Sequence, residues 1–215
     1  LARAGAGVLE TVGVALAGTA MGTLVAIPLG LLVARVVGRG WMRGTGWAWS
    51  AVPAFVTRLA LASARAVPPV ALALVAVAFV GLGPKAGAVA LAIHTAGVLG
   101  KLFAESLELA DLQPAEALVA GGSSALAAIF AGLVPSALPA ASAHLSYRFE
   151  WNGRASTTLG IVGAGGLGQQ IYNAEQLFHD HELLAYVLVA MAVVLASDAL
   201  AVKFRRRLQL RTMER

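Results

Sequence analysis

Four ionisable side chains lie within long apolar stretches of the sequence: His94, Arg148, Glu150 and Arg154. Charged groups in apolar segments are costly and usually face a cavity or a partner. Two arginines with one acid leave net positive charge, and a guanidinium group matches the oxygens of a phosphoryl anion. We therefore expect these residues to line a path for an anion. The alternatives are a structural ion pair that fixes helix packing and, for His94, a hydrogen-bonded packing histidine.

The residues that catalysis would need are missing at the required spacings. The chain has no cysteine, and it lacks Gly-x-Ser-x-Gly, His-Glu-x-x-His and paired aspartates within apolar segments. It also lacks Gly-x-x-x-x-Gly-Lys-Ser/Thr, so it cannot bind ATP in that manner. Residues 179–182 have the composition of metal ligands but not their spacing, which favours a polar external loop. We expect no catalytic residue, no metal and no cofactor in this chain.

The composition indicates a membrane protein. Of 215 residues, 59% are hydrophobic and 13% are charged, whereas soluble domains carry about 25% charged residues. A chain this apolar cannot cover its own core with polar groups, so the bilayer must be its solvent. The 24 glycines suit helices that approach closely in lipid. Because the basic residues lie largely between and after apolar runs, the net charge of +5 indicates membrane topology rather than nucleic-acid binding.

Apolar stretches of about 20 residues or more predict five membrane-spanning helices in a single all-α domain that covers residues 1–215. The expected spans are residues 8–37, 47–80, 86–109, 136–162 and 183–202. The second stretch is too long for one straight span, and Pro68 and Pro69 within it predict an interfacial helix that leads into a kinked span. Residues 111–135 are predicted to form short helices between two spans.

Charge sets the expected orientation, because basic loops stay on the cytoplasmic side. Arg39 and Arg43 lie between the first two spans, and six basic residues follow the last span from Lys203 onward. Placing both segments inside also puts residues 111–135 inside, with Leu1 and the turn at residues 81–85 outside. The two basic segments thus agree with one topology of five spans.

Several other polar and aromatic residues have simpler expected roles. Lys101 and Glu105 can form an intrahelical pair, although a solvated helix end is favoured for this region. Asp198 is expected to pair with a basic neighbour or to lie at the membrane edge. The four tryptophans are typical of membrane interfaces; they are Trp41, Trp47, Trp49 and Trp151.

The segment 111–135 carries the most specific motif, Gln-Pro-Ala-Glu-Ala-Leu-Val-Ala-Gly-Gly from residue 113, followed by Val134-Pro135. Pro114 suits the first turn of a helix, where Glu116 also favours the positive end of the dipole. The two glycines then end that helix. The segment resembles the signature loop of bacterial ABC-importer permeases, with Glu116, Ala117, Gly122 and Pro135 at matching positions and Leu118 as a mild departure.

Four further segments resemble the phosphonate/phosphate importer permeases: Arg-Ala-Val-Pro from residue 65, Gly-Leu-Gly-Pro from 81, the stretch 94–105, and the stretch 147–166. The resemblance runs from about Glu10 to Arg207, and Gly153 departs from it where a bulkier apolar residue is common. It implies an ABC-importer permease with a methionine-permease-like architecture in the bacterial inner membrane.

The resemblance also implies a complex. A second permease subunit, identical or different, would pair with this chain, and two cytoplasmic ATPases would bind ATP and Mg and dock at Glu116, Ala117, Gly122 and Pro135. An external binding protein would deliver a phosphonate- or phosphate-type oxyanion. The glycine-rich run, Gly163, Gly165, Gly166 and Gly168, would lie beside the outer mouth. The alternatives are a permease for another small solute, such as an amino acid, and a passive membrane scaffold.

Overall fold

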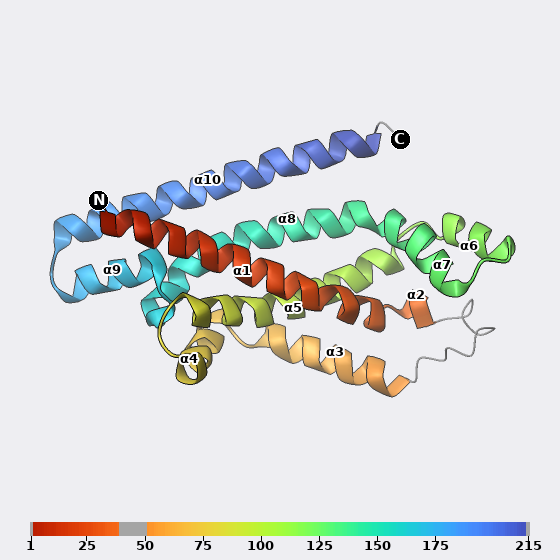
Figure 1. The fold of residues 1–215 in the computed structure, drawn as a ribbon, viewed down its shortest axis with the longest axis horizontal. Coiled ribbons are helices and arrows are strands. Elements are labelled where there is room, and N and C mark those ends of the chain that lie inside the picture. The colour runs from red at the N-terminus through yellow and green to blue at the C-terminus, as the bar shows by residue number, and fades with distance from the viewer. Residues whose placement is uncertain (1, 39–50, 214–215) are drawn as a thin grey trace.

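The computed structural model of the chain describes residues 2–38 and 51–213, and these residues form helices and no strand (Figure 1). The long helices are α1 (Ala2–Val33), α5 (Pro84–Glu108), α8 (Val134–Leu159) and α10 (Asp180–Met213). The shorter helices are α2 (Arg35–Gly38), α3 (Ala51–Ala66), α4 (Pro69–Val80), α6 (Gln113–Ala120), α7 (Ala125–Ala128) and α9 (Gly166–Gln176). Two π-helical turns, η1 (Ile129–Leu133) and η2 (Gly160–Ala164), flank α8. The expected all-α fold is confirmed.

Four described segments are long and apolar enough to cross a membrane: Ala4–Val33, Pro84–Glu108, Ala125–Ala164 and Asp180–Ala199. A fifth span is formed if α3 and α4 are counted together, although these two helices bend by 97°. The fold class with about five apolar helices is therefore confirmed. Residues 39–50, with Arg39, Arg43, Trp41, Trp47 and Trp49, lie outside the described residues.

In its described part, from residue 51, the stretch 47–80 consists of the two helices α3 and α4, which meet at a sharp bend. Pro69 opens α4, and Pro68 before it has extended backbone angles, φ −58° and ψ 139°. Proline lacks an N–H and disfavours helical angles at the residue before it, so α3 cannot continue through this pair. The two consecutive prolines thus produce a sharp corner where a single proline would give a kink.

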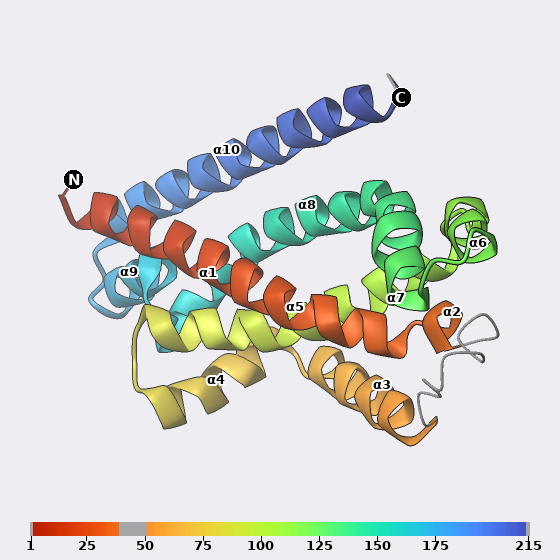
Figure 2. The ribbon, with the colours of Figure 1, turned by 45° about the vertical axis from the view of Figure 1, so that its right-hand side comes forward.

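The long helices run side by side and define two ends of the molecule (Figures 1 and 2). One end, which we call the α6 end, holds α2, α6, α7 and the end of α10. The opposite end, the α9 end, holds the start of α1, the turn from α4 to α5, and α9. This arrangement agrees with the separation of residues 111–135 from residues 81–85 that the charge pattern predicts.

Small residues on α5 make it the central helix. Its buried positions are mostly alanine and glycine, among them Ala86, Ala90, Gly97, Gly100 and Ala104. Helices in lipid associate through close packing, which small side chains allow. Glycines of α1 meet this surface: a methyl group added at Gly22 would lie 2.6 Å from Thr95 Cβ and 2.8 Å from the Ala92 carbonyl oxygen. The backbones of α1 and α5 can therefore approach only because Gly22 has no side chain.

The substitution Gly22→Ala tests this packing, with Gly13→Ala on the same helix as its control. The added methyl group at residue 22 should push α1 away from α5, and overpacking of this kind costs about 1–3 kcal/mol. A methyl group at residue 13 meets nothing within 4 Å in this chain, and alanine favours helix by about 0.5–1 kcal/mol over glycine. Thermal denaturation in detergent should show a lower midpoint for Gly22→Ala alone; equal midpoints would contradict the proposed contact.

Candidate functional site

A buried cluster of polar side chains lies where α1, α5 and α8 meet. Thr19 belongs to α1, His94 and Thr95 to α5, and Arg148 and Asn152 to α8. Thr95 and Asn152 have no exposed surface, and Arg148 is only 5% exposed. The spacing of four residues from Arg148 to Asn152 places both on one face of α8, toward α5. Three of the five residues are uncharged, so the sequence alone did not mark them.

Hydrogen bonds join the cluster across three helices. Asn152 Nδ2 donates to Thr19 Oγ1 at 2.7 Å and to Thr95 Oγ1 at 3.0 Å. The Thr95 hydroxyl donates to Asn152 Oδ1 at 3.3 Å, and it accepts from Arg148 Nε at 3.3 Å. Thr19 donates its own proton to the backbone oxygen of Ala15 at 2.6 Å. The hydroxyl of Thr95 therefore stands at the centre, between the amide of Asn152 and the guanidinium of Arg148.

Arg148 is a buried cation without a carboxylate partner in the part of the chain that the structure describes. None of the ion pairs formed among the described residues includes it, and its Nη2 is buried without a hydrogen-bond partner. The Trp151 ring supports the guanidinium from one face, with 4.0 Å between Cζ and the ring centre. His94 stacks on Trp151 at 5.4 Å between ring centres, and its Nδ1 is also buried without a partner.

An isolated buried charge is expensive, because the interior does not replace the solvation it loses. The cation–π contact with Trp151 and the neutral hydrogen bond to Thr95 offset part of that cost. What remains is positive potential in a poorly screened environment, with a free N–H donor. This arrangement can attract an anion and hydrogen-bond to it.

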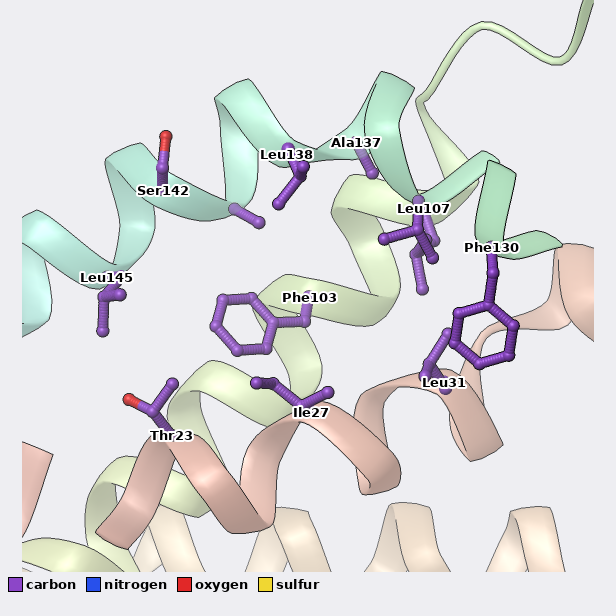
Figure 3. Close-up of a pocket in the computed structure, with 12 residues that line it drawn as sticks. Thr23, Ile27, Leu31, Phe103, Leu107, Phe130, Ala137, Leu138, Ser142 and Leu145 are labelled. Atoms are coloured by element: carbon purple, nitrogen blue, oxygen red, sulfur yellow. The ribbon is translucent and has the colours of Figure 1, made fainter. Parts of the chain in front are cut away.

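An apolar pocket lies between α1, α5 and α8, on the side of the cluster toward the α6 end (Figure 3). Two of its lining residues adjoin the cluster along their helices: Thr23 is one turn from Thr19, and Leu145 is one turn from Arg148. Figure 3 shows the side chains of Ile27, Phe103 and Leu145 around its open space. The remaining lining residues are Leu31, Leu107, Phe130, Val134, Ala137, Leu138, Ala141 and Ser142.

The structure separates Glu150 and Arg154 from Arg148 and His94. Residues two apart on a helix point about 200° away from each other, so Glu150 and Arg148 occupy different faces of α8. Arg154 pairs with Glu150 on α8, and its Nη2 lies 3.6 Å from Asp198 Oδ1 on α10. The expected pairing of Asp198 with a basic neighbour is confirmed. These three residues form an ion-pair cluster that joins α8 to α10.

The motif residues of segment 111–135 lie at the α6 end. Glu116 and Ala117 are exposed on α6, while Ala115 is fully buried. A methyl group added at Gly132 of η1 would lie 2.6 Å from Ala115 Cα, so α6 packs tightly on η1 by its opposite side. Pro135 stands in the first turn of α8. The buried side of α6 therefore packs against η1, and the opposite side exposes Glu116 and Ala117.

Gly122 ends α6 in a left-handed conformation, with φ +83°. The N–H of Ser123 donates to the Leu118 carbonyl at 2.9 Å, and the N–H of Gly122 donates to the Val119 carbonyl at 3.0 Å. This is the pattern of a Schellman motif, which needs a residue that tolerates positive φ. The second glycine of the motif therefore has a specific backbone role, whereas Gly121 has an ordinary φ of −78°.

Side chains also tie the break between α1 and α2 to its neighbours at the α6 end. Arg58 Nη2 on α3 donates to the Val33 carbonyl at 2.8 Å. The N–H of Arg35 donates to Glu108 Oε1 of α5 at 2.9 Å. The pair Lys101–Glu105, the less favoured of the two expectations for this region, forms at 3.2 Å between side chains that are 50% and 45% exposed, so the helix end is solvated as well. The role of Glu108 at the start of α2 was not foreseen, because its partner is 73 residues away.

The glycine-rich run lies at the α9 end. Gly163, Gly165 and Gly166 all have positive φ, between +75° and +87°. The N–H of Gly166 donates to Glu10 Oε2 at 2.8 Å, and the N–H of the next residue donates to Thr11 Oγ1 at 2.9 Å. Two side chains of α1 therefore satisfy the first N–H groups of α9. Gly168 lies against the Thr157 carbonyl, where a side chain has no room.

Trp151 is the residue whose expected role the structure corrects. Its type is typical of a membrane interface, but it lies half-buried between His94 and Arg148. The sequence could have indicated this position. Residues 151 and 152 follow Arg148 by three and four positions, and residues at these spacings share a face of a helix.

Comparison with known proteins gives a match over most of the chain. The family model described as "Binding-protein-dependent transport system inner membrane component" matches residues 18–211. The phosphite transport system permease protein PtxC of Stutzerimonas stutzeri is 33% identical over 198 residues, which are 92% of this chain and 68% of that protein. The phosphate-import permease protein PhnE of Mycolicibacterium smegmatis is 37% identical over 201 residues, which are 93% of this chain and 36% of that protein.

A third relative, HtxC of Stutzerimonas stutzeri, is 36% identical over 66% of its own length. The chain thus spans about two thirds of the length of PtxC and HtxC and about one third of that of PhnE.

Solved structures share the fold. A chain from inward-facing structures of the MetNI methionine ABC transporter matches with a TM-score of 0.78 at 20% identity, with 96% of each chain covered. A chain from an amino acid ABC transporter matches with a TM-score of 0.72 at 18% identity, covering 94% of this chain and 92% of that one. The expected methionine-permease-like architecture is confirmed, and at these identities the likeness concerns the fold alone.

Proposed function

Because the chain belongs to the family of inner membrane components of binding-protein-dependent transport systems, we propose that it is the permease subunit of an ATP-driven importer. As a member of this family it is a multi-pass inner-membrane protein. Its proposed cargo is a small phosphorus oxyanion, which an external binding protein delivers. The named activities of PtxC and PhnE support this cargo class.

The cargo assignment rests on the burial and the missing ion-pair partner of Arg148. It is a buried guanidinium with a free Nη2 and no carboxylate partner among the described residues. A cation in a water-poor path lowers the barrier for an anion, and guanidinium groups suit phosphoryl oxygens. We propose that Arg148 and His94 line the translocation path and that the apolar pocket toward the α6 end continues it. An amino acid cargo has only the fold likeness in its favour.

Glu150 and Arg154 were expected in the same path. Their pairing with each other and with Asp198 favours the alternative role, an ion-pair cluster that fixes α10 against α8. Arg154 provides little unpaired charge, and its side chain is 51% exposed. We therefore assign cargo recognition to Arg148 and His94, and packing to Glu150 and Arg154.

The second proposed contact is with the ATPases. The helix α6 would dock on a cytoplasmic ATPase through the surface that carries Glu116 and Ala117, with Gly122 and Pro135 setting its position. The partner ATPases would bind ATP and Mg and hydrolyse the nucleotide, and a second permease subunit would complete the path. At the opposite end, the run from Gly163 to Gly168 would lie beside the outer mouth.

Single-cysteine labelling tests the orientation, since the chain has no cysteine of its own. Ser123 follows α6 and Gln176 ends α9, so the two positions lie at opposite ends. A membrane-impermeant maleimide should label Gln176→Cys in cells with an intact inner membrane, and Ser123→Cys only after permeabilisation. The reverse pattern would refute the orientation.

Gly122→Ala tests the coupling role of α6, with Gly121→Ala as the adjacent control. Alanine in a left-handed conformation costs about 1–2 kcal/mol, so the end of α6 should shift. We expect less uptake for each ATP hydrolysed by the complete complex. Gly121→Ala should leave this ratio unchanged, because its φ is −78° and its added methyl group makes ordinary contacts. Normal coupling in Gly122→Ala would argue against docking through α6.

Arg148→Ala tests the path, with Arg154→Ala as the control on the same helix. Hydrogen bonds to charged groups contribute about 1.5–3 kcal/mol, which corresponds to an uptake loss of about 10–100-fold. Uptake of phosphite, phosphate and a phosphonate is measured in the reconstituted complex, together with assembly and basal ATPase activity. Arg148→Ala should lose uptake and keep the other two properties, and Arg154→Ala should chiefly lower stability.

Arg148→Lys separates charge from geometry in the same assay. Partial recovery of uptake would indicate simple electrostatics, whereas no recovery would indicate recognition by two N–H groups at once. Unchanged uptake in Arg148→Ala, or loss of assembly, would overturn the path role. Preferential uptake of an amino acid by the wild-type complex would overturn the cargo assignment.

A further inference from the structure

We infer that Thr95 is a positioning residue for Arg148: its hydroxyl, oriented by Asn152 and Thr19, holds the guanidinium by Nε and leaves the Nη groups for the oxyanion. This inference rests on the proposed path role of Arg148. It goes beyond it by assigning the orientation of the cation to three uncharged residues on α1, α5 and α8.

The hydrogen bonds have a fixed direction, which begins at the backbone of α1. Thr19 gives its only proton to the Ala15 carbonyl, so toward Asn152 it can only accept. This requirement turns the Nδ2 group of Asn152 toward Thr19, while both Nδ2, at 3.0 Å, and Oδ1, at 3.3 Å, lie within hydrogen-bond distance of Thr95 Oγ1. Thr95 then gives its proton to Asn152 Oδ1 and presents a lone pair to Arg148 Nε.

Every donor and acceptor of the Thr95 hydroxyl is therefore in use. A hydroxyl has one proton and two lone pairs. The proton goes to Asn152 Oδ1, and the lone pairs accept from Asn152 Nδ2 and Arg148 Nε. Thr95 has no capacity left to bind cargo itself. Its contribution is to hold one edge of the guanidinium group.

Two contacts then define the position of the guanidinium plane. Thr95 holds the Nε edge, and Trp151 lies against one face at 4.0 Å. A guanidinium group can offer oxygen ligands the edge with Nε and Nη2 or the fork formed by the two Nη groups. With Nε occupied, the fork is left for an incoming anion, and Nη2 is buried without a partner.

The Thr95 side chain is also uncharged, and this property matters for binding an anion. A carboxylate at this place would hold Arg148 more strongly, but it would also cancel the charge that the anion must meet. A hydroxyl fixes the group by a weaker bond and leaves the full positive charge. The site thereby combines a defined geometry with an uncompensated cation, while the weaker restraint also suits a path that must release its cargo.

Thr95→Val and Thr19→Val provide matched tests in the complete complex with its ATPases and binding protein. Valine has nearly the shape of threonine, and both changes remove one buried hydroxyl from the same network. Of these two threonines, Thr95 is the one that hydrogen-bonds to Arg148. We expect phosphite and phosphate uptake to fall about tenfold in Thr95→Val, because a bond to a charged group is lost, and by about threefold or less in Thr19→Val. Thr95→Ser keeps the hydroxyl and should restore most of the uptake.

A double substitution provides the readout that a merely structural role would not change. Lysine has no Nε group for Thr95 to hold, so Thr95→Val should have little further effect on uptake in an Arg148→Lys background. Equal losses from Thr95→Val in the wild-type and Arg148→Lys backgrounds would overturn the inference. Failure of Thr95→Val to assemble would show that the hydroxyl holds the fold instead.

The outcome also distinguishes this inference from the proposed function. If Arg148→Ala abolishes uptake while Thr95→Val leaves uptake unchanged, the path role stands and the positioning role is wrong. If Arg148→Ala leaves uptake unchanged, the path role is wrong and the positioning role falls with it.

Discussion

The polar cluster depends on the close approach of α1 to α5, which glycines on α1 allow. Short hydroxyl side chains on these two helices can reach the same residue of α8 only when the two backbones lie close together. Gly18 lies over Leu91 and Gly22 over Thr95, with no room for a methyl group at either position. In a lipid environment, packing of this kind replaces the hydrophobic effect as the force between helices. The contact also places Thr19, Thr95 and Asn152 within reach of one another.

The polar cluster that results has an unusual electrostatic balance. Buried charges in membrane proteins commonly have a partner of opposite sign. The chain forms an ion-pair cluster elsewhere, between the partly exposed Arg154 and the carboxylates of Glu150 and Asp198. Arg148 instead has a neutral hydroxyl and an aromatic face. The same helix therefore carries two arginines with different electrostatic surroundings. One has its charge balanced within the protein, and the other has no carboxylate partner among the residues that the structure describes.

The α6 end connects the proposed ATPase-facing helix to the rest of the chain through one apolar cluster. Val33, Ala34 and Val37 at the end of α1 and in α2 belong to the same cluster as Ala115 of α6 and Leu133 of η1. Arg58 and Glu108 hold the break between α1 and α2 by its backbone. Close-packed interiors transmit displacements because they have little free volume. A displacement of α6 would therefore be transmitted to α1, the helix that also carries Thr19.

The sequence by itself determined the membrane setting, the all-α class and the family, because these follow from composition, the length of apolar runs and the spacing of Glu116, Ala117, Gly122 and Pro135. It also marked Arg148 as unusual, since a charge in an apolar run stands out without any structure. Only the tertiary structure decided that Arg148 and Glu150 have separate surroundings, that Trp151 lies in the interior, and that Thr19, Thr95 and Asn152 form one network with the cation. These outcomes depend on which helix faces meet, over separations of 133 residues in the case of Asn152 and Thr19. Uncharged residues such as threonine and asparagine occur at many positions in helices, so only their contacts across α1, α5 and α8 distinguish these three from the rest.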